Sequence, residues 1–334
     1  MDLYSMPKVE LHRHLEGSVR LPTAFALAHE ARLALPASSP EELRRALCVL
    51  EPMDDLASVL AVFDLLGRLF VSESIVERLA YEVVSDAAAD NIKLLELRYS
   101  PDYMARHAGL DWDRMTEALL RGVRRAMDEH DIVVGLIAIV SRSLGLASAR
   151  RTVDYARRWQ SALVGFDLAD DEVAWPSHLF TEALAPLGEL ALGLTVHSGE
   201  SCGPEHVWDT LRSLSPQRIG HGVAIGADPA LLAEVKRRGV VVEVCPTSNL
   251  RTRAVPSLEA HPARVLFEQG VQVSFNTDDP GLFDIILTSE LQLAQQCMGF
   301  TAEELLWIQK NSVKYSFLSD SDKISLLSKF DAEI

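Results

Sequence analysis

The sequence predicts a single (β/α)8 barrel, and three observations point to this fold. Short apolar or β-branched runs recur along the 334 residues, separated by longer stretches with helical periodicity. Several runs are apolar on both faces, as strands are when helices cover one side and a core the other. No low-complexity linker or internal repeat divides residues 1–334. Strands and helices that alternate within one domain are typical of this barrel.

The expected strands follow one another at intervals that leave room for helices. The stretch 72–91 is amphipathic, and the stretch 229–239 ends on Gly239, as helices often do. The eight expected strands cover residues 9–17, 92–100, 132–141, 163–170, 192–200, 218–222, 240–249 and 272–280.

The connection between the first two expected strands breaks the regular spacing. It contains a helical insertion with a segment rich in Leu, Val and Phe, residues 54–70. This segment is either an ordinary helix that faces the core or a hydrophobic lid over the mouth of the barrel. In the second case Phe63 faces a ligand.

The charge and cysteine content exclude several classes of partner. The chain has 32 basic and 48 acidic residues, a net charge of −16, which disfavours binding to nucleic acid or to an anionic membrane. The first ten residues lack the pattern of a signal peptide, and the longest apolar run, 132–140, is too short to span a bilayer. The four cysteines lack CxxC spacing. We therefore expect a cytoplasmic protein that binds a small molecule, as a monomer or weak homo-oligomer.

Polar residues gather where the expected strands end, which is where barrel enzymes carry their active sites. His12 and His14 are two apart on a strand, so both rings point into the barrel. His197 and Asp278 end two other strands. Three histidine nitrogens and one carboxylate suit Zn²⁺ and leave room for a water molecule.

The number of metal ions follows from the middle strands. Barrel hydrolases that hold two metals commonly bridge them with a carboxylated lysine or a carboxylate from a middle strand. Residues 132–141 and 163–170 contain no lysine, so we expect one metal ion per chain. Asp167 as a bridge between two ions remains open.

Three further residues at the strand ends suit catalysis or substrate binding. Glu200 follows His197 by three residues, past a glycine, and is placed to act as an acid or base without binding the metal. His221 ends the next strand, where it can orient a water molecule. Asp279 either holds a substrate nitrogen, the interpretation that we prefer, or caps the next helix.

Taken together, these stretches resemble the successive motifs of bacterial adenosine deaminases of the metal-dependent barrel type. The resemblance runs in order from about residue 7 to beyond 290, and so covers nearly the whole chain. It rests on the motifs PKVELHRHLEGSVR, LLELRYSPDYMA, GFDLADDE, TVHSGE, RIGHG, EVCPTSNLRT and NTDDPGLF.

The resemblance implies hydrolytic removal of the 6-amino group of adenosine or 2′-deoxyadenosine, with release of ammonia. Glu200 would protonate the purine ring at N1, His221 would orient the attacking water, and Asp279 would face purine N7. Asp278 would take part in catalysis, and His14 would lie beside the substrate. The metal ligands that the resemblance implies are His12, His14, His197 and Asp278.

Two departures from the family pattern fall on substrate-binding positions. The family usually has Asp where this chain has Glu16, and that carboxylate holds the ribose 5′-hydroxyl. The family usually has Gly where this chain has Asp170, whose backbone N–H would face purine N3. The chemistry should persist, whereas the sugar side of the pocket is open to change.

The sequence leaves alternative functions open. Adenine deaminase, or a deaminase of another 6-aminopurine derivative, is the nearest, because its first motif also has Glu after HL. A barrel phosphoesterase would need a basic residue near the rim and usually more than one metal. A non-catalytic binding protein would have no chemical need for the full ligand set together with Glu200.

Overall fold

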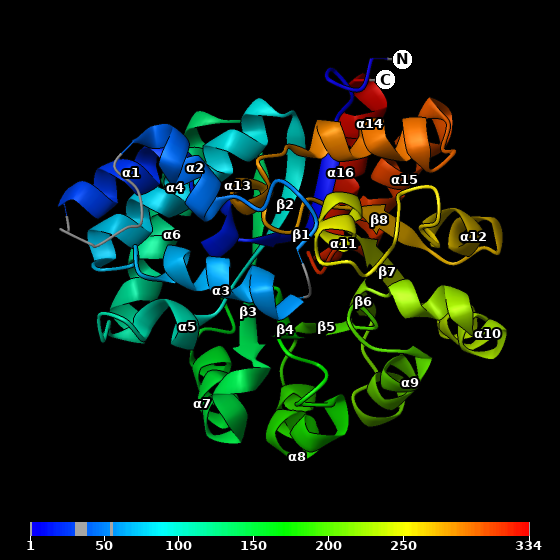
Figure 1. Cartoon of the computed structure of the whole chain (residues 1–334), viewed down its shortest axis with the longest axis horizontal. Helices are drawn as coiled ribbons and strands as arrows, with labels where there is room; N and C mark the ends of the chain where they lie inside the picture. The colour runs from blue at the N-terminus through cyan, green and yellow to red at the C-terminus, as the bar shows by residue number, and fades with distance from the viewer. Residues whose placement is uncertain (1, 31–38, 54–55, 334) are drawn as a thin grey trace.

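The computed structural model describes residues 2–30, 39–53 and 56–333. Eight parallel strands form one sheet in the order β1 to β8, and the predicted (β/α)8 barrel is confirmed. In Figure 1 the strands lie at the centre and the helices surround them. The strands are β1 (Lys8–His14), β2 (Ile92–Tyr99), β3 (Val133–Ser141), β4 (Gly165–Ala169), β5 (Gly193–Ser198), β6 (Arg218–His221), β7 (Val241–Val244) and β8 (Val273–Phe275).

The barrel closes between the first and the last strand. Just beyond β8, Asp278 N–H donates to the carbonyl of His12 at 3.0 Å, and His14 N–H donates to the carbonyl of Asp278 at 2.8 Å. Arg13 and Asp278 therefore form a parallel bridge. This closure brings two of the expected metal ligands of β1 beside a third that lies more than 260 residues away in the sequence.

The helices follow the strands and cover the outside of the barrel. The α-helices are α1 (Leu21–Glu30), α2 (Pro40–Leu47), α3 (Leu56–Gly67), α4 (Glu73–Ala89), α5 (Pro101–Ala105), α6 (Trp112–Glu129), α7 (Gly145–Arg158), α8 (Thr181–Leu184), α9 (Pro204–Ser213), α10 (Pro229–Arg238), α11 (Pro246–Arg251), α12 (Ala263–Glu268), α13 (Pro280–Phe283), α14 (Leu287–Cys297), α15 (Ala302–Tyr315) and α16 (Asp320–Glu333). Short 3-10 turns are η1 (Glu16–Ser18), η2 (Arg142–Leu144), η3 (Ser177–Phe180), η4 (Ala185–Glu189) and η5 (Val223–Ala227).

All eight expected strands occur, most of them shorter than expected, and the difference is largest for the last two. The predicted strand 240–249 ends at Val244, because Pro246 occupies the first turn of α11 and cannot continue a strand ladder. The predicted strand 272–280 ends at Phe275, and its polar end forms the loop that carries Asp278. The prediction that the helix before β7 ends on Gly239 is confirmed: this residue caps α10 with φ 68°.

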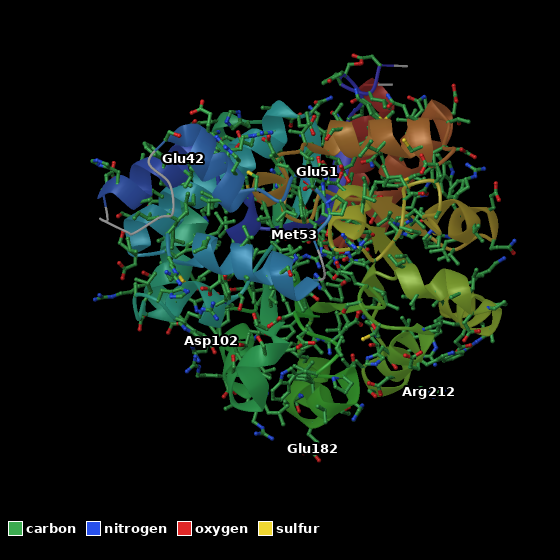
Figure 2. All side chains as sticks on the ribbon, in the orientation of Figure 1. Glu42, Glu51, Met53, Asp102, Glu182 and Arg212 are labelled. Carbon is green, nitrogen blue, oxygen red and sulfur yellow. The ribbon has the colours of Figure 1, made fainter. Side chains whose placement is uncertain are left out.

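The inside of the barrel is charged, and the apolar core lies between the sheet and the helices. Two arginines and two glutamates from β2, β6 and β7 are fully buried: Glu96, Arg98, Arg218 and Glu243. Leu, Val, Ile and Phe side chains form apolar clusters that include residues of the surrounding helices. Exposed charged side chains such as Glu182 and Arg212 project from the outer helices (Figure 2).

Four helices, α1 to α4, connect β1 to β2 and form the helical insertion. In Figure 1 α1, α2 and α3, drawn in blue, lie on one side of the barrel. Val59 and Leu66 of α3 are buried in the main apolar cluster, and Val59 also lines the central cavity together with Leu60 and Phe63. This helix thus combines the core-facing and ligand-facing interpretations of the segment 54–70, of which residues 54–55 lie outside the described residues. Among the described residues, no helix has the length and apolar character needed to cross a membrane.

Candidate active site

A cavity of about 390 Å³ opens at the carboxyl ends of the strands. Barrel enzymes carry their active sites at this end of the strands, so the position of the cavity is the one expected for an active site. Its walls combine expected site residues with residues of the insertion. The lining residues include His14, Glu16, Phe63, Tyr103, Arg106, Ser143, Asp170, His197, Glu200, His221, Asp278 and Asp279.

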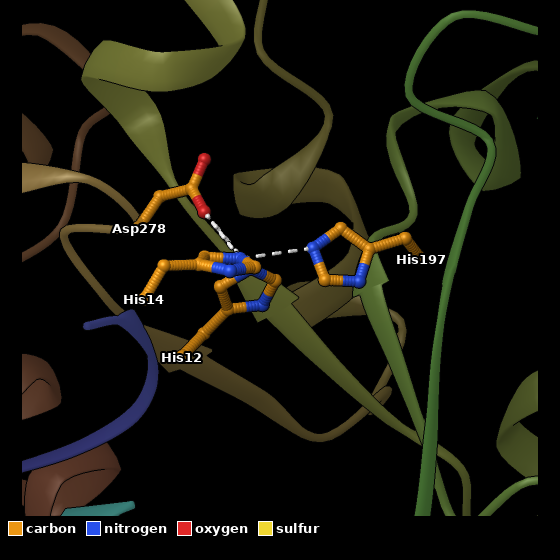
Figure 3. Close-up of side chains that lie close together, drawn as sticks. All are labelled: His12, His14, His197 and Asp278. Carbon is orange, nitrogen blue, oxygen red and sulfur yellow. Dashed lines mark hydrogen bonds and ion pairs between the residues drawn. The ribbon is translucent and has the colours of Figure 1, made fainter. Parts of the chain in front are cut away.

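Four side chains meet at the bottom of this cavity in an arrangement that can hold a metal ion. One ligand atom each from His12, His14, His197 and Asp278 lies within 4.8 Å of the others, and all four residues are buried. Oδ1 of Asp278 lies 3.1 Å from Nε2 of both His12 and His14. Figure 3 shows the three imidazole rings and the carboxylate facing one another.

The protonation pattern of the rings fits a metal ion. Nδ1 of His12 lies 2.7 Å from Glu243 Oε2, and Nδ1 of His197 lies 3.1 Å from Asp167 Oδ1, so both Nδ1 atoms carry the ring proton. Their Nε2 atoms therefore present lone pairs toward a common centre. Nε2 of His12 is buried and has no hydrogen-bond partner among the described residues, although Asp278 lies close. Burial lowers the pKa of His14 to about 4, which keeps this ring neutral and its lone pair available to a metal ion.

A network of buried charges beneath the ligands holds their rings in place. Arg98 donates to Asp167 Oδ2 at 2.8 Å and to Glu243 Oε2 at 3.0 Å. Arg218 Nε lies 2.6 Å from the other oxygen of Glu243. Burial raises the pKa of Glu243, but Arg98 and Arg218 outweigh it and hold that pKa well below its usual range. Asp167 thus contacts Arg98 and His197, an arrangement that disfavours its alternative role as a bridge between two metals.

Sequence reasoning missed the role of Glu243. Its signal is a single glutamate in the apolar run VVVEV, where a charge is costly unless it has partners. Sequence reasoning also missed the role of Gly220 on β6. A Cβ there would lie 2.9 Å from His12 Cε1, so glycine makes room for the ring.

Glu200 lies buried beside the metal ligands. Burial, and then the charge of Asp278, raise the pKa of Glu200 to about 8, so this carboxyl can carry a proton at neutral pH. Its Oε2 lies 3.6 Å from Nε2 of His221. Burial lowers the pKa of His221 well below its usual value, so this ring is neutral. An acid and a neutral imidazole thus face the same region of the cavity.

Glu172, which the sequence analysis did not single out, fixes the loop that carries Glu200. Its carboxylate accepts hydrogen bonds from the backbone N–H groups of Gly199, Glu200 and Ser201 at 2.8, 2.9 and 2.8 Å. Glu172 is itself buried. The motif DLADDE contains this residue, but only the fold reveals its partners, 27 to 29 residues away.

The backbone at three site residues adopts a left-handed conformation that side chains rarely take. The φ angles are 84° at Asp170, 63° at His221 and 64° at Asp278. Such conformations persist where the surrounding contacts over-determine them, and they concentrate at functional sites. His221 is the last residue of β6, Asp170 directly follows β4, and Asp278 lies in the loop after β8.

Two further carboxyl groups that line the cavity each have one oxygen without a partner among the described residues. Glu16 Oε1 accepts a hydrogen bond from Ser100 N–H at 2.7 Å, but its Oε2 and Oδ1 of Asp279 have none among the described residues. Burial raises the pKa of Glu16 to about 7, and burial with the charge of Asp278 raises that of Asp279 well above its usual range. Asp279 fits because Gly17 lacks a side chain: a Cβ there would lie 1.8 Å from its Oδ1.

The side chain of Asp170 is held by hydrogen bonds at the rim of the cavity. Its Oδ2 accepts from the hydroxyl and, at 3.2 Å, from the N–H of Ser143, and its Oδ1 accepts from the N–H of Asp171 at 2.7 Å. The carboxylate thus joins the loop after β4 to the loop after β3. The charge that Asp170 adds where the family usually has Gly therefore has partners at the rim.

Comparisons with known proteins agree with the site. A family model described as adenosine deaminase matches residues 7–333. An adenosine deaminase of Shewanella denitrificans is 36% identical over 322 residues, which is 96% of this chain and 97% of the relative. An adenosine deaminase of Klebsiella pneumoniae is 36% identical over 325 residues, 97% and 98% of the two chains.

Solved structures give a similar picture with a wider range of substrates. An adenine deaminase of Arthrobacter aurescens superposes with a TM-score of 0.89 at 26% identity and 98% coverage of both chains. An N6-methyl-AMP deaminase of Arabidopsis thaliana gives 0.85 at 28% identity, with 99% and 97% coverage. An amidohydrolase of Burkholderia ambifaria with bound zinc gives 0.89 at 27% identity, with 99% and 92% coverage.

These findings confirm the resemblance inferred from the motifs and the prediction of a hydrolase. The family is metal-dependent, and the buried cluster of three histidines and one aspartate supplies ligands for a metal ion. Both the family model and the bacterial relatives cover almost the whole chain. The chain belongs to the adenosine deaminase family.

Proposed function

We propose that the protein hydrolyses adenosine and 2′-deoxyadenosine to inosine and 2′-deoxyinosine, with release of ammonia, in cytoplasmic purine salvage. The observation that carries this proposal is the position of Glu200. A buried carboxyl that holds a proton near neutral pH lies beside a set of metal ligands, in a cavity of about 390 Å³. This volume is within the range of small-molecule sites.

We further propose one Zn²⁺ per chain, held by His12, His14, His197 and Asp278. Three imidazoles and a carboxylate are a donor set typical of zinc. When bound, zinc acts as a Lewis acid that makes water acidic enough to serve as a nucleophile near neutral pH. The zinc found in the amidohydrolase of Burkholderia ambifaria supports this assignment.

The remaining steps belong to side chains of this chain. Glu200 donates its proton to N1 of the purine, which makes C6 more electrophilic, and His221 orients the water that adds to C6. Asp279, with its raised pKa, keeps a proton and donates a hydrogen bond to N7. Of the two hydrogens of the added water, one leaves with the 6-amino group as ammonia and the other replaces the proton that Glu200 gave to N1, so a 6-oxopurine remains and the atoms balance. Glu16 offers its free Oε2 to a hydroxyl of the sugar.

A nucleoside suits this cavity better than a nucleotide. The wall carries the carboxyl groups of Glu16, Asp64, Asp170, Asp171 and Asp279. The guanidinium of Arg106 also lies there, but it pairs with Asp64. A 5′-phosphate at Glu16 would meet an acidic surface without an unpaired cation among the described lining residues.

Adenine deamination is the second candidate function. The free oxygen of Glu16 favours it, because a carboxyl that lacks a sugar partner can hold a ring N–H of free adenine. The similarity to the adenine deaminase of Arthrobacter aurescens supports it as well. If the protein deaminates adenine, the chemistry at C6 is unchanged, and only the role of Glu16 in substrate binding differs.

An ultraviolet assay of the zinc-loaded protein distinguishes these candidates. Adenosine, 2′-deoxyadenosine, adenine, AMP and N6-methyl-AMP are compared in parallel. Rapid turnover of the two nucleosides, with adenine and both nucleotides slower by at least about 100-fold, is the expected result. Turnover of adenine alone would establish the second candidate. Turnover of either nucleotide at the rate of adenosine would contradict the nucleoside assignment.

A further inference from the structure

We propose that His261 and Asn249 are positioning residues that determine which ring nitrogen of His221 carries its proton. The inference deepens the proposed function, because it concerns the residue expected to orient the attacking water. Neither residue lines the cavity. Both reach His221 through a buried chain of hydrogen bonds that begins at the backbone of α12.

Three contacts link this chain. The backbone N–H of Ala263 donates to Nδ1 of His261 at 3.1 Å. Nε2 of His261 lies 3.1 Å from Oδ1 of Asn249 in α11. Nδ2 of Asn249 lies 3.0 Å from Nδ1 of His221, at the end of β6. Asn249 is 0%, His221 2% and His261 4% exposed, so water does not compete for these groups.

The direction of every bond follows from the first one. A backbone N–H can only donate, so Nδ1 of His261 must offer a lone pair. Burial lowers the pKa of His261 to about 4, so the ring is neutral and its single proton lies on Nε2. That proton is donated to Asn249, which fixes the carbonyl oxygen of the amide toward His261 and its NH₂ group toward His221. The assignment does not depend on a choice of amide orientation, which is otherwise ambiguous.

The consequence at His221 is a defined tautomer. Because Nδ1 accepts from Asn249, the ring proton lies on Nε2, the nitrogen that approaches Glu200 in the cavity. His221 therefore presents an N–H donor to the oxygen that adds to C6. The opposite tautomer would present a lone pair and repel an oxygen that is gaining negative charge. Fixed donors of this kind contribute about 10²- to 10³-fold to a rate.

The test uses two variants that differ by one group. In His261→Gln the new amide can accept from Ala263 and donate to Asn249, so the chain keeps its direction. In His261→Glu the carboxylate only accepts, so the amide of Asn249 must turn and present its oxygen to His221. The Nδ1 atom of His221 would then have to carry the proton. Asn249→Asp has the same effect by a second route.

The primary readout is the tautomer itself. Two-bond ¹H–¹⁵N spectra of zinc-loaded, ¹⁵N-histidine-labelled protein without substrate report which nitrogen carries the proton, and His221→Asn identifies the signals by their loss. We expect the Nε2–H form in the wild type and in His261→Gln, and the Nδ1–H form in His261→Glu and Asn249→Asp. An Nδ1–H form in the wild type, or an unchanged tautomer in both carboxylate variants, would overturn the proposal.

The kinetic readout separates positioning from general damage. For His261→Glu we expect kcat to fall by about 10²-fold with KM within about two-fold, and for His261→Gln nearly full recovery. Equal losses in both variants would mean that the bonds only hold the loop, which contradicts the proposal. The spectra need no substrate, so they decide the tautomer even if the proposed deamination fails in the ultraviolet assay.

Discussion

The metal side of the cavity and its rim differ in how firmly their side chains are held. On the metal side, formed by His12, His14, His197 and Asp278, every residue is buried, and charges beneath it fix two of the rings. The rim, formed by Phe63, Tyr103, Arg106, Ser143 and Asp170, includes exposed and half-buried residues from the insertion and from the segments after β2, β3 and β4. Buried contacts inside the barrel hold rings on the metal side, whereas the residues of the rim lie on segments outside the strands. The chemistry is therefore hard to change by substitution, and the substrate range is easier to change.

Among substitutions that compare the metal side with the rim, the largest loss of activity is expected at Glu200, beside the metal ligands. Glu200→Gln removes the proton donor but keeps the shape, so kcat should fall by about 10³-fold while bound zinc stays at one per chain. Kinetics and metal analysis check this result. Glu205→Gln, an exposed glutamate on α9, is the matched control and should leave kcat unchanged. A loss of less than about ten-fold would mean that another group protonates the purine.

The pH dependence tests the same group without a substitution. Glu200 has a raised pKa, about 8, so it carries the proton below that pH and loses it as the pH rises. We expect kcat/KM to decline on the alkaline side through about pH 8. Glu200→Gln should lack this alkaline limb. A limb that persists unchanged in the variant would assign it to a different group.

The next effect tests whether the buried charges hold the metal side. Glu243→Gln weakens the contacts to His12, Arg98 and Arg218 and leaves buried positive charge without its partner. We expect zinc affinity to fall about 10- to 100-fold and the free energy of unfolding to fall by about 3 kcal/mol. Competition with a chelator and denaturant unfolding measure the two. Glu234→Gln, which breaks ion pairs with Arg237 and Arg238 on α10, should leave zinc affinity unchanged.

A smaller effect is expected at the rim. Phe63→Ala removes a ring that lines the cavity and packs 5.2 Å from the ring of Tyr103. We expect KM for adenosine to rise by about ten-fold with little change in kcat, because the lost contacts serve binding rather than chemistry. Val62→Ala, the neighbouring residue outside the cavity lining, is the control. A selective fall in kcat would show that the rim also takes part in the chemistry.

The smallest effect is expected for Asp170→Gly. Glycine adopts φ 84° without strain, which offsets the lost bonds to Ser143, so the free energy of unfolding should change by less than about 1 kcal/mol. Ser143→Ala loses a bond without relieving strain and should be the less stable of the two. Thermal unfolding compares them. A destabilisation by Asp170→Gly as large as that of Glu243→Gln would remove the distinction between rim and metal side.

The same contrast explains what could be predicted from the sequence. His12 and His14 could be assigned because strand periodicity places both on one face, a local property. The fold class likewise followed from short-range periodicity. Glu243 and Glu172 could not be assigned, because their partners are reached only when the barrel closes: 231 residues separate Glu243 from His12. The predicted end of the strand 240–249 was wrong. The stretch CPTSN directly follows an apolar run and was counted as part of the strand, although Pro246 marks the boundary.

The closure of the barrel at β1 also dictates when the site can form during synthesis. β1 is translated first, but its neighbour beyond β8 follows about 265 residues later, and the cluster that covers Val9 and Leu11 includes Leu326 and Phe330 near the C-terminus. The ends of the chain meet at this strand. A nascent chain therefore carries His12 and His14 on an unpaired sheet edge until the segment that follows β8 has been synthesised.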